Sequence, residues 1–202
     1  MKLPNNARIL KMIYEFREQF DQPIVKFFND YNHAQAALYG RLIAEELNEY
    51  EIARSRVDRL DAIGDLTYVI FGAAASTGVP PYAYKGVWLK ANPAYKMPLP
   101  ATSRLVNILS NPHPKLLPLI NAITNAYYEM EQAAAVAGVK LLPLVEEIHF
   151  SNMSKLWTAH EVEELPSEFV ATKKGANYLV KRKADGKVIK SPSYRPPSLE
   201  NF

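Results

Sequence analysis

The chain has 202 residues, 48% of them hydrophobic and 22% charged, and a formal net charge of +3. This length and composition suit one packed domain with room for an additional segment, and so small a charge is no reason to expect nucleic-acid binding. The absence of cysteine excludes disulfides, thiolate zinc sites and cysteine nucleophiles. No apolar run is long enough for a membrane helix or for the core of a signal peptide, so we expect a cytoplasmic protein without a membrane partner.

Apolar residues at helical spacing predict three helices in the first part of the chain, over residues 7–20, 33–56 and 55–78. Ser55 and Asp58 have the spacing of a capping box, which marks the start of the third helix. Gly78 marks its end, because glycine readily takes the left-handed conformation that terminates helices. Between the first two helices, Pro23 is suited to open a further short helix.

A proline-rich segment interrupts the helical pattern. Residues 79–118 hold eight of the fifteen prolines, so no long helix runs through them, although a short helix fits residues 103–109. Two longer helices follow, over residues 116–137 and 142–155.

Near the C-terminus, Asp185-Gly186 is flanked by residues of weakly alternating polarity, which predicts a hairpin turn. We therefore expect an all-α protein, a bundle of four to five helices with a small C-terminal β-hairpin. Residues 1–158 would form the helical domain, with residues 79–118 as an insertion, and residues 159–202 would form a C-terminal extension.

Acidic residues form two groups on consecutive predicted helices. The groups are Glu45, Glu46 and Glu49 on one helix, and Asp58, Asp61 and Asp65 on the next. Spacings of three and four residues bring the side chains of each group onto one face of a helix, where like charges repel one another. If the two helices pack antiparallel, the groups meet. A divalent cation is then the expected counter-charge, because Mg²⁺ takes oxygen ligands and completes its shell with water and substrate phosphates.

The simpler interpretation of these acids is a charged, solvated surface. Runs such as Glu-Glu-x-x-Glu are common on exposed helices, and an aspartate in the first turn of a helix is favoured by the helix dipole whatever its function. The pairing of the two groups favours a site instead. Apolar residues beside the acids, such as Leu42 and Val69, also predict that this side of both helices faces inward.

The basic residues are distributed unevenly as well. Between Leu66 and Tyr128 there is no Asp or Glu, and residues 171–195 hold eight basic residues against one acid. Such stretches commonly form subunit contacts or solvated tails. The alternative is that some of these cations face an anionic substrate such as a triphosphate.

Several motifs occur in a characteristic order. Glu-Glu-Leu-Asn-Glu at 45–49 is followed by Asp-Ala-Ile-Gly-Asp-Leu-Thr-Tyr-Val at 61–69, then by Asn-Met-Ser-Lys at 152–155, and finally by a tail at 187–197. Together with the first helix, they resemble the MazG-like all-α NTP pyrophosphohydrolases, relatives of phosphoribosyl-ATP pyrophosphohydrolase, in their phage and bacterial branch. The chain departs from the family at Ala62, which stands where a glutamate is usual, so Asp61 is expected to serve in its place.

The resemblance implies metal-dependent hydrolysis of a (deoxy)nucleoside triphosphate to the monophosphate and pyrophosphate, in nucleotide-pool control, with Mg²⁺ or Mn²⁺ and two or more ions per site. It implies a set of site residues: Glu46, Glu49, Asp61 and Asp65 as metal ligands, Glu45 and Glu46 as catalytic carboxylates, and Asn152 and Lys155 as phosphate-binding groups. Glu45 would act as a further ligand or as the base that orients the water.

The resemblance also implies an oligomer and a range of substrates. Relatives form dimers or tetramers, so a homodimer or homotetramer is expected. They act on dUTP, dCTP, purine dNTPs or damaged nucleotides, and the phage-like motifs favour a purine dNTP such as dGTP. Tyr68 would lie near the site, either as part of the core or stacked on the base.

Other readings of the sequence are weaker. Glu146-x-x-His149 has the spacing of a di-iron ligand pair, but the second such motif is missing. Neither a P-loop nor a serine nucleophile elbow is present. A non-catalytic helical nucleotide-binding or scaffold protein remains the alternative, supported by Ala62. Nucleic-acid binding through the basic tail is not expected, because the tail lacks a recognisable reader module.

Overall fold

The computed structural model describes residues 4–81 and 96–202. Its elements, in chain order, are α1 (Asn5–Gln19), the 3-10 helix η1 (Phe28–Asp30), α2 (His33–Ile52), α3 (Arg56–Thr77), α4 (Pro100–Leu109), α5 (Leu116–Val136), α6 (Leu141–Met153), β1 (Phe169–Lys174) and β2 (Asn177–Arg182). The all-α class with a small β-hairpin is therefore confirmed. In the described residues there are six α-helices, and the sixth, α4, contains the short helix predicted over residues 103–109. The middle of the proline-rich segment lies outside the described residues.

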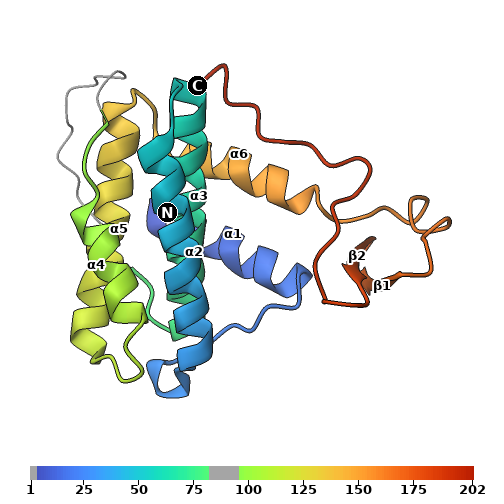
Figure 1. Ribbon diagram of the computed structural model, residues 1–202, viewed down its shortest axis with the longest axis horizontal. Coiled ribbons are helices and arrows are strands. Elements are labelled where there is room, and N and C mark those ends of the chain that lie inside the picture. Colours follow the sequence, from blue (N-terminus) through green and yellow to red (C-terminus); the bar gives the residue numbers. More distant parts are fainter. Residues whose placement is uncertain (1–3, 82–95) are drawn as a thin grey trace.

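Helix α3 lies at the centre of the fold. It packs against α1, α2, α5 and α6, and most of its residues are buried, as its nearly continuous apolar and small-residue sequence requires. Figure 1 shows α2, α3, α4 and α5 running alongside one another, whereas α1 and α6 extend together to one side. Within the described ranges, no helix is long and apolar enough to cross a membrane.

The helix ends follow from local chemistry. The Asn32 side chain caps α2 by accepting a hydrogen bond from the Gln35 amide. Ser55 and Asp58 form the predicted capping box of α3, and Gly78, with φ of 69°, ends that helix in the left-handed conformation.

Helix α4 is capped from another helix. Its own N-cap residue supplies no side-chain hydrogen bond. The Glu129 carboxylate of α5 accepts instead from the backbone amides of Ala101 (2.6 Å) and Thr102 (2.7 Å). This buried cap satisfies helix-terminal amides that the preceding proline-rich sequence leaves open, and the acid comes from outside the segment itself.

Two glycines of α3 allow close helix packing. A Cβ at Gly64 would lie 2.5 Å from Cγ1 of Ile148 in α6, and a Cβ at Gly72 would lie 2.2 Å from Cε1 of Tyr39 in α2. Both distances are far below van der Waals contact. Glycine at these positions therefore brings α2 and α6 close to the helix that carries Asp61 and Asp65.

The prediction of a β-hairpin near the C-terminus is confirmed, but the predicted position of its turn is wrong. Strands β1 and β2 pair antiparallel around Gly175, whose φ of 60° suits a tight turn. The predicted turn at Asp185-Gly186 exists too, but it leads only to an isolated bridge between Lys181 and Val188. Both Gly175 and Gly186 form turns, but β2 pairs along its length with β1, so the turn at Gly175 closes the hairpin.

The prediction that Pro23 opens a helix is wrong. The next helical turn in the described chain is η1, five residues later. The segment around Pro23 is held extended by tertiary bonds: Pro23 O accepts from Nε of Arg17 (2.9 Å), and the Val25 amide donates to Ala75 O (2.9 Å). These bonds replace the intrahelical bonds that a helix would form.

Candidate active site

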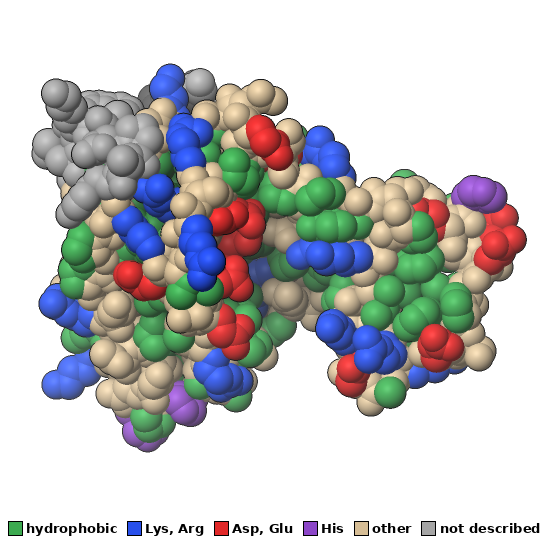
Figure 2. All heavy atoms as spheres, turned by 45° about the horizontal axis from the view of Figure 1, so that its top comes forward, with side chains coloured by type: hydrophobic (Ala, Val, Ile, Leu, Met, Phe, Trp, Pro, Cys, Tyr) green, Lys and Arg blue, Asp and Glu red, His purple; other side chains and the backbone are tan. Residues whose placement is uncertain are grey.

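A cavity of about 520 Å³ lies between α1, α2, α3, α6 and the C-terminal tail. Its size is within the range of small-molecule sites. Its lining combines charged and polar side chains with aromatic and apolar ones. Figure 2 shows acidic side chains gathered along the middle of the helical body, beside the hollow that separates it from the C-terminal part.

Three of the predicted carboxylates line this cavity. Glu46 comes from α2, and Asp61 and Asp65 come from successive turns of α3. The two helices are joined by only a few residues and pack side by side, so the predicted meeting of the two acidic groups occurs. No ion pair reaches these three carboxylates from a cation in the described part of the chain.

The electrostatics of the cavity reflect this unbalanced charge. Burial, reinforced by the charges of Asp65, Glu49, Asp61 and Glu45, raises the pKa of Glu46 to about 8. Burial and the Asp61 and Glu49 charges raise the pKa of Asp65 to about 7, against the lowering effect of Lys155. The pKa of Asp61 is raised by burial and by Glu49. At neutral pH the cavity thus retains protons that solvent-exposed carboxylates would have lost.

The remaining predicted acids lie outside the cavity lining. Glu49 is exposed, but its charge raises the pKa values of all three lining carboxylates, so it lies close by. Glu45 is exposed, and of the three lining carboxylates its charge raises the pKa of Glu46 alone. Asp58 is exposed and belongs to the capping box, where the Ser55 hydrogen bonds lower its pKa, so the structure assigns it to helix capping.

The predicted phosphate-binding pair faces the same cavity. Asn152 lies near the end of α6 and Lys155 just beyond it, and the Lys155 ammonium donates to Oδ1 of Asn152 (2.5 Å). Burial lowers the pKa of Lys155, while Tyr194, Asp65 and Glu46 act in the opposite direction. The lysine thus presents a partly desolvated positive charge beside the acids.

Tyr68 also lines the cavity and is tied to α6. Its hydroxyl lies 3.0 Å from Nδ1 of the buried His149, and its ring meets Phe16 edge-on. His149 is therefore a partner of Tyr68 and, by its other nitrogen, lies 3.7 Å from Glu15. The ring of Tyr68 serves as both core packing and cavity wall.

The cavity includes residues that the sequence did not single out. Arg17 of α1 is almost fully buried and donates to the hydroxyl of Tyr39 and to Gly72 O. Lys190 and Tyr194 come from the C-terminal tail. Arg17 lies on the amphipathic first helix, and no short-range sequence pattern distinguishes it from an arginine on the surface of such a helix. The tail residues lie in a recognisable motif, but its position over the site depends on the tertiary fold.

The carboxylates fit a divalent metal by their chemistry. Oε2 of Glu46 is buried and has no hydrogen-bond partner among the described residues, and an acid with a free buried oxygen beside further carboxylates is a donor set for Mg²⁺ or Mn²⁺. As the side chains stand, no three His, Asp or Glu residues in ranges 4–81 and 96–202 converge on one point. Small rotations of the side chains would have to complete the shell.

The raised pKa values predict how the metal-free protein responds to pH. Because folding raises the pKa of Glu46 to about 8 and that of Asp65 to about 7, the folded state binds more protons than the unfolded state above the usual carboxyl range. The free energy of unfolding should then fall as pH rises through these values. His149, whose pKa burial lowers, has the opposite effect, but only below about pH 6.5.

Thermal melts in EDTA between pH 6.5 and 8.5 check this prediction, with Mg²⁺ or Mn²⁺ added to parallel samples. We expect the melting temperature in EDTA to fall across this window and the stabilisation by metal to grow, because metal binding displaces protons. A melting temperature that rises with pH in EDTA, or a metal effect that does not change, would contradict the assignment of these two carboxylates.

The comparisons with known proteins bear on the same helices. Residues 13–85 match the model of the phosphoribosyl-ATP pyrophosphohydrolase family. No significant match was found among curated proteins or among solved structures. The matched segment contains the C-terminal part of α1 and all of α2 and α3, and so carries Glu46, Asp61 and Asp65, whereas α6 and the tail lie beyond it. The segment that carries the acids of the cavity is therefore similar to the phosphoribosyl-ATP pyrophosphohydrolase family, in the MazG-like NTP pyrophosphohydrolase superfamily.

Proposed function

We propose that the cavity is the active site of a metal-dependent nucleoside triphosphate pyrophosphohydrolase. The observation that carries this proposal is the convergence on one cavity of unpaired carboxylates from α2 and α3 with the ammonium group of Lys155. The family match supports pyrophosphohydrolase activity on nucleoside triphosphates in general. Carboxylates alone would repel a triphosphate. Divalent cations bound to the carboxylates would reverse this repulsion and allow the phosphates to bind beside them.

The order of the lining residues along α3 suits a nucleotide. Along α3 the lining runs from Asp61 and Asp65 to Tyr68 and then Gly72, and Tyr39 of α2 lies against Gly72. The charged part would take the phosphates and the metal, and the aromatic part would take the base. Stacking on aromatic rings tolerates any base, so the ring set supports binding without selecting purine or pyrimidine.

The reaction proposed is attack of water on the α-phosphorus, with pyrophosphate as the leaving group. Glu46, Glu49, Asp61 and Asp65 would hold Mg²⁺ or Mn²⁺, which supplies charge neutralisation and an activated water. Glu46, with its unpartnered buried oxygen, is the best placed of the acids to orient that water. Glu45, outside the cavity lining, is the weaker candidate for this role.

Asn152 and Lys155 would act on the phosphate chain. The amide group of Asn152 offers hydrogen-bond donors, and Lys155 offers a positive charge that is partly removed from water and therefore stronger toward phosphate than an exposed lysine. Their mutual hydrogen bond fixes the ammonium group before substrate arrives, which lowers the entropic cost of binding.

A nucleotide panel tests the proposal. Each common dNTP and NTP is incubated with the protein and Mg²⁺ or Mn²⁺, and the products are separated to distinguish pyrophosphate from orthophosphate. We expect pyrophosphate and the matching monophosphate in equal amounts, no activity in EDTA, and a preference for a purine dNTP such as dGTP. No pyrophosphate from any nucleotide, even at high protein concentration, would favour the non-catalytic nucleotide-binding alternative.

A further inference from the structure

The C-terminal tail, residues 190–202, returns from the hairpin across α6 to the start of α3 (Figure 1). Its last buried apolar residue is Leu199, and the backbone carbonyl of Phe202 accepts a hydrogen bond from Arg56 of α3. The end of the tail is therefore anchored to the helical body. It lies outside the segment matched by the family model.

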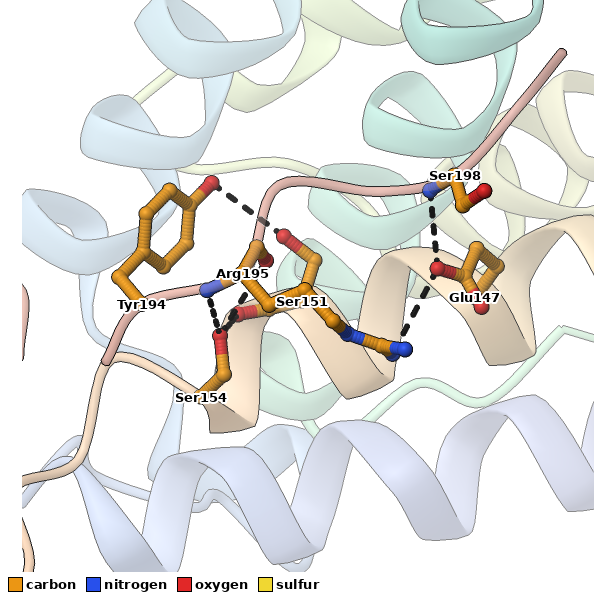
Figure 3. Close-up of polar contacts among 6 residues, drawn as sticks. All are labelled: Glu147, Ser151, Ser154, Tyr194, Arg195 and Ser198. Atoms are coloured by element: carbon orange, nitrogen blue, oxygen red, sulfur yellow. Dashed lines mark hydrogen bonds and ion pairs between the residues drawn. The ribbon is translucent and has the colours of Figure 1, made fainter.

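Polar contacts fasten the tail to α6, as Figure 3 shows. Oε1 of Glu147 accepts from the Ser198 amide (2.9 Å) and lies 3.5 Å from the Arg195 guanidinium. The hydroxyl of Ser154 accepts from the Arg195 amide (2.9 Å), and the Ser151 hydroxyl lies 3.3 Å from that of Tyr194. These bonds fix the backbone of the tail on the C-terminal side of Tyr194, and the Ser191 amide, which donates to Lys155 O (3.2 Å), fixes it on the other side. The side chains of this part of the tail therefore have a defined position.

This fixed tail forms one wall of the candidate active site. Lys190 and Tyr194 line the cavity together with Lys155 and Asp65. The Lys190 ammonium lies 4.1 Å from the centre of the Tyr194 ring, a cation–π contact that holds it at the cavity rim. The tail thus contributes a second ammonium group to a cavity that already contains one.

The two lysines are close enough to repel each other, since the charge of Lys190 lowers the pKa of Lys155. Neither ammonium group forms an ion pair within 4.0 Å with a carboxylate in the described part of the chain. An anion that contacts both ammonium groups would relieve this repulsion. A phosphate chain, with charged oxygens along its length, is such an anion.

We propose that the C-terminal tail is part of the nucleotide site, and that Lys190, positioned by Tyr194, binds the triphosphate chain together with Lys155. This inference rests on the proposed function and adds a binding group that comes from outside the family segment. Lys190 would act before and during the reaction alike, because it contacts phosphate charge that is present in substrate and transition state. Its loss should therefore weaken substrate binding more than turnover.

Binding of α,β-imido dNTPs with Mg²⁺, measured by titration calorimetry on the full chain, tests the proposal without turnover. We expect Lys190→Ala to weaken the dissociation constant about 10-fold, as loss of one charge-assisted contact predicts, and Lys190→Arg to restore most of it. Lys187→Ala, which removes the same charge from an exposed position outside the cavity lining, should bind like wild type.

Two further variants address the position of Lys190. Tyr194→Leu should reproduce part of the Lys190→Ala effect, and Glu147→Gln, which weakens the hold on Arg195 and Ser198, should do the same. In steady-state assays these variants should raise KM with kcat within about 2-fold of wild type. Melting curves check that each variant folds.

The outcomes separate the two proposals. If wild type binds the analogues and Lys190→Ala binds them equally well, the tail has no role in binding and the inference is overturned. The same holds if Lys187→Ala loses as much affinity as Lys190→Ala, since the effect is then one of general charge. If wild type binds none of the analogues, the proposed function itself fails, and the inference fails with it.

Discussion

Replacement of Asp65 by asparagine is expected to abolish pyrophosphate release while making the metal-free protein more stable at pH 8. Asp65 lies in the cavity among Glu46, Asp61 and Glu49, and its pKa is raised to about 7 mainly by burial. Loss of a group that only hydrogen-bonds a metal ligand already costs about 10- to 100-fold in activity, so loss of a ligand itself should cost more than about 100-fold in kcat/KM. Removal of one buried like charge should stabilise folding by about 1 kcal/mol.

Steady-state assays and melts in EDTA measure the two effects separately. Asp30→Asn is the matched control, because it makes the same change at an exposed position and should alter neither quantity. An Asp65→Asn protein that is destabilised in EDTA would mean that the carboxylate is a structural acceptor. One that retains activity would mean that the site lies elsewhere.

The second large effect is expected at Arg17. This residue is 1% exposed, and its guanidinium donates to three acceptors from three parts of the chain: Pro23 O, the hydroxyl of Tyr39 and Gly72 O. Arg17→Met keeps much of the packing but removes the charged donor from the Pro23 carbonyl, the Tyr39 hydroxyl and the Gly72 carbonyl. Since hydrogen bonds to charged groups contribute about 1.5–3 kcal/mol each, we expect a loss of about 3 kcal/mol in the free energy of unfolding.

Urea unfolding followed by circular dichroism measures this change. Arg41→Met on the exposed side of α2 is the control and should alter stability by less than about 0.5 kcal/mol. Arg17→Lys should recover part of the loss, because an ammonium group can reach fewer of the acceptors. An Arg17→Met protein as stable as wild type would show that these acceptors find other hydrogen-bond donors. It would also show that the part of the cavity wall formed by Tyr39 and Gly72 does not depend on Arg17.

The helices were predictable because their signals are local. The capping box at Ser55 and the glycine at Gly78 lie next to the residues whose conformation they set, and both act as predicted. The start of α4 was not predictable in this way, since its capping acid, Glu129, comes from the next helix. The position of the hairpin was missed for a similar reason: both Gly175 and Gly186 can form turns, and tertiary pairing selects between them.

The candidate site shows the same division. Spacing along α2 and α3 indicated which acids share a face, and the packing of these helices brings Glu46, Asp61 and Asp65 to one cavity. The same spacing could not show that Glu49 and Glu45 lie outside the cavity lining. Helix periodicity indicates which face of a helix a residue occupies, but not how deeply that residue is buried. Arg17 and the tail residues reach the cavity through contacts far apart in the sequence, which no local pattern encodes.

The most direct test of the central claim is the position of water attack. Turnover of a dNTP in H₂¹⁸O with Mg²⁺, followed by mass spectrometry of both products, should place the label in the monophosphate and leave pyrophosphate unlabelled, with no turnover by Glu46→Gln. Label in pyrophosphate or in orthophosphate would contradict attack at the α-phosphorus. Full activity of Glu46→Gln would contradict the assignment of this cavity as the active site.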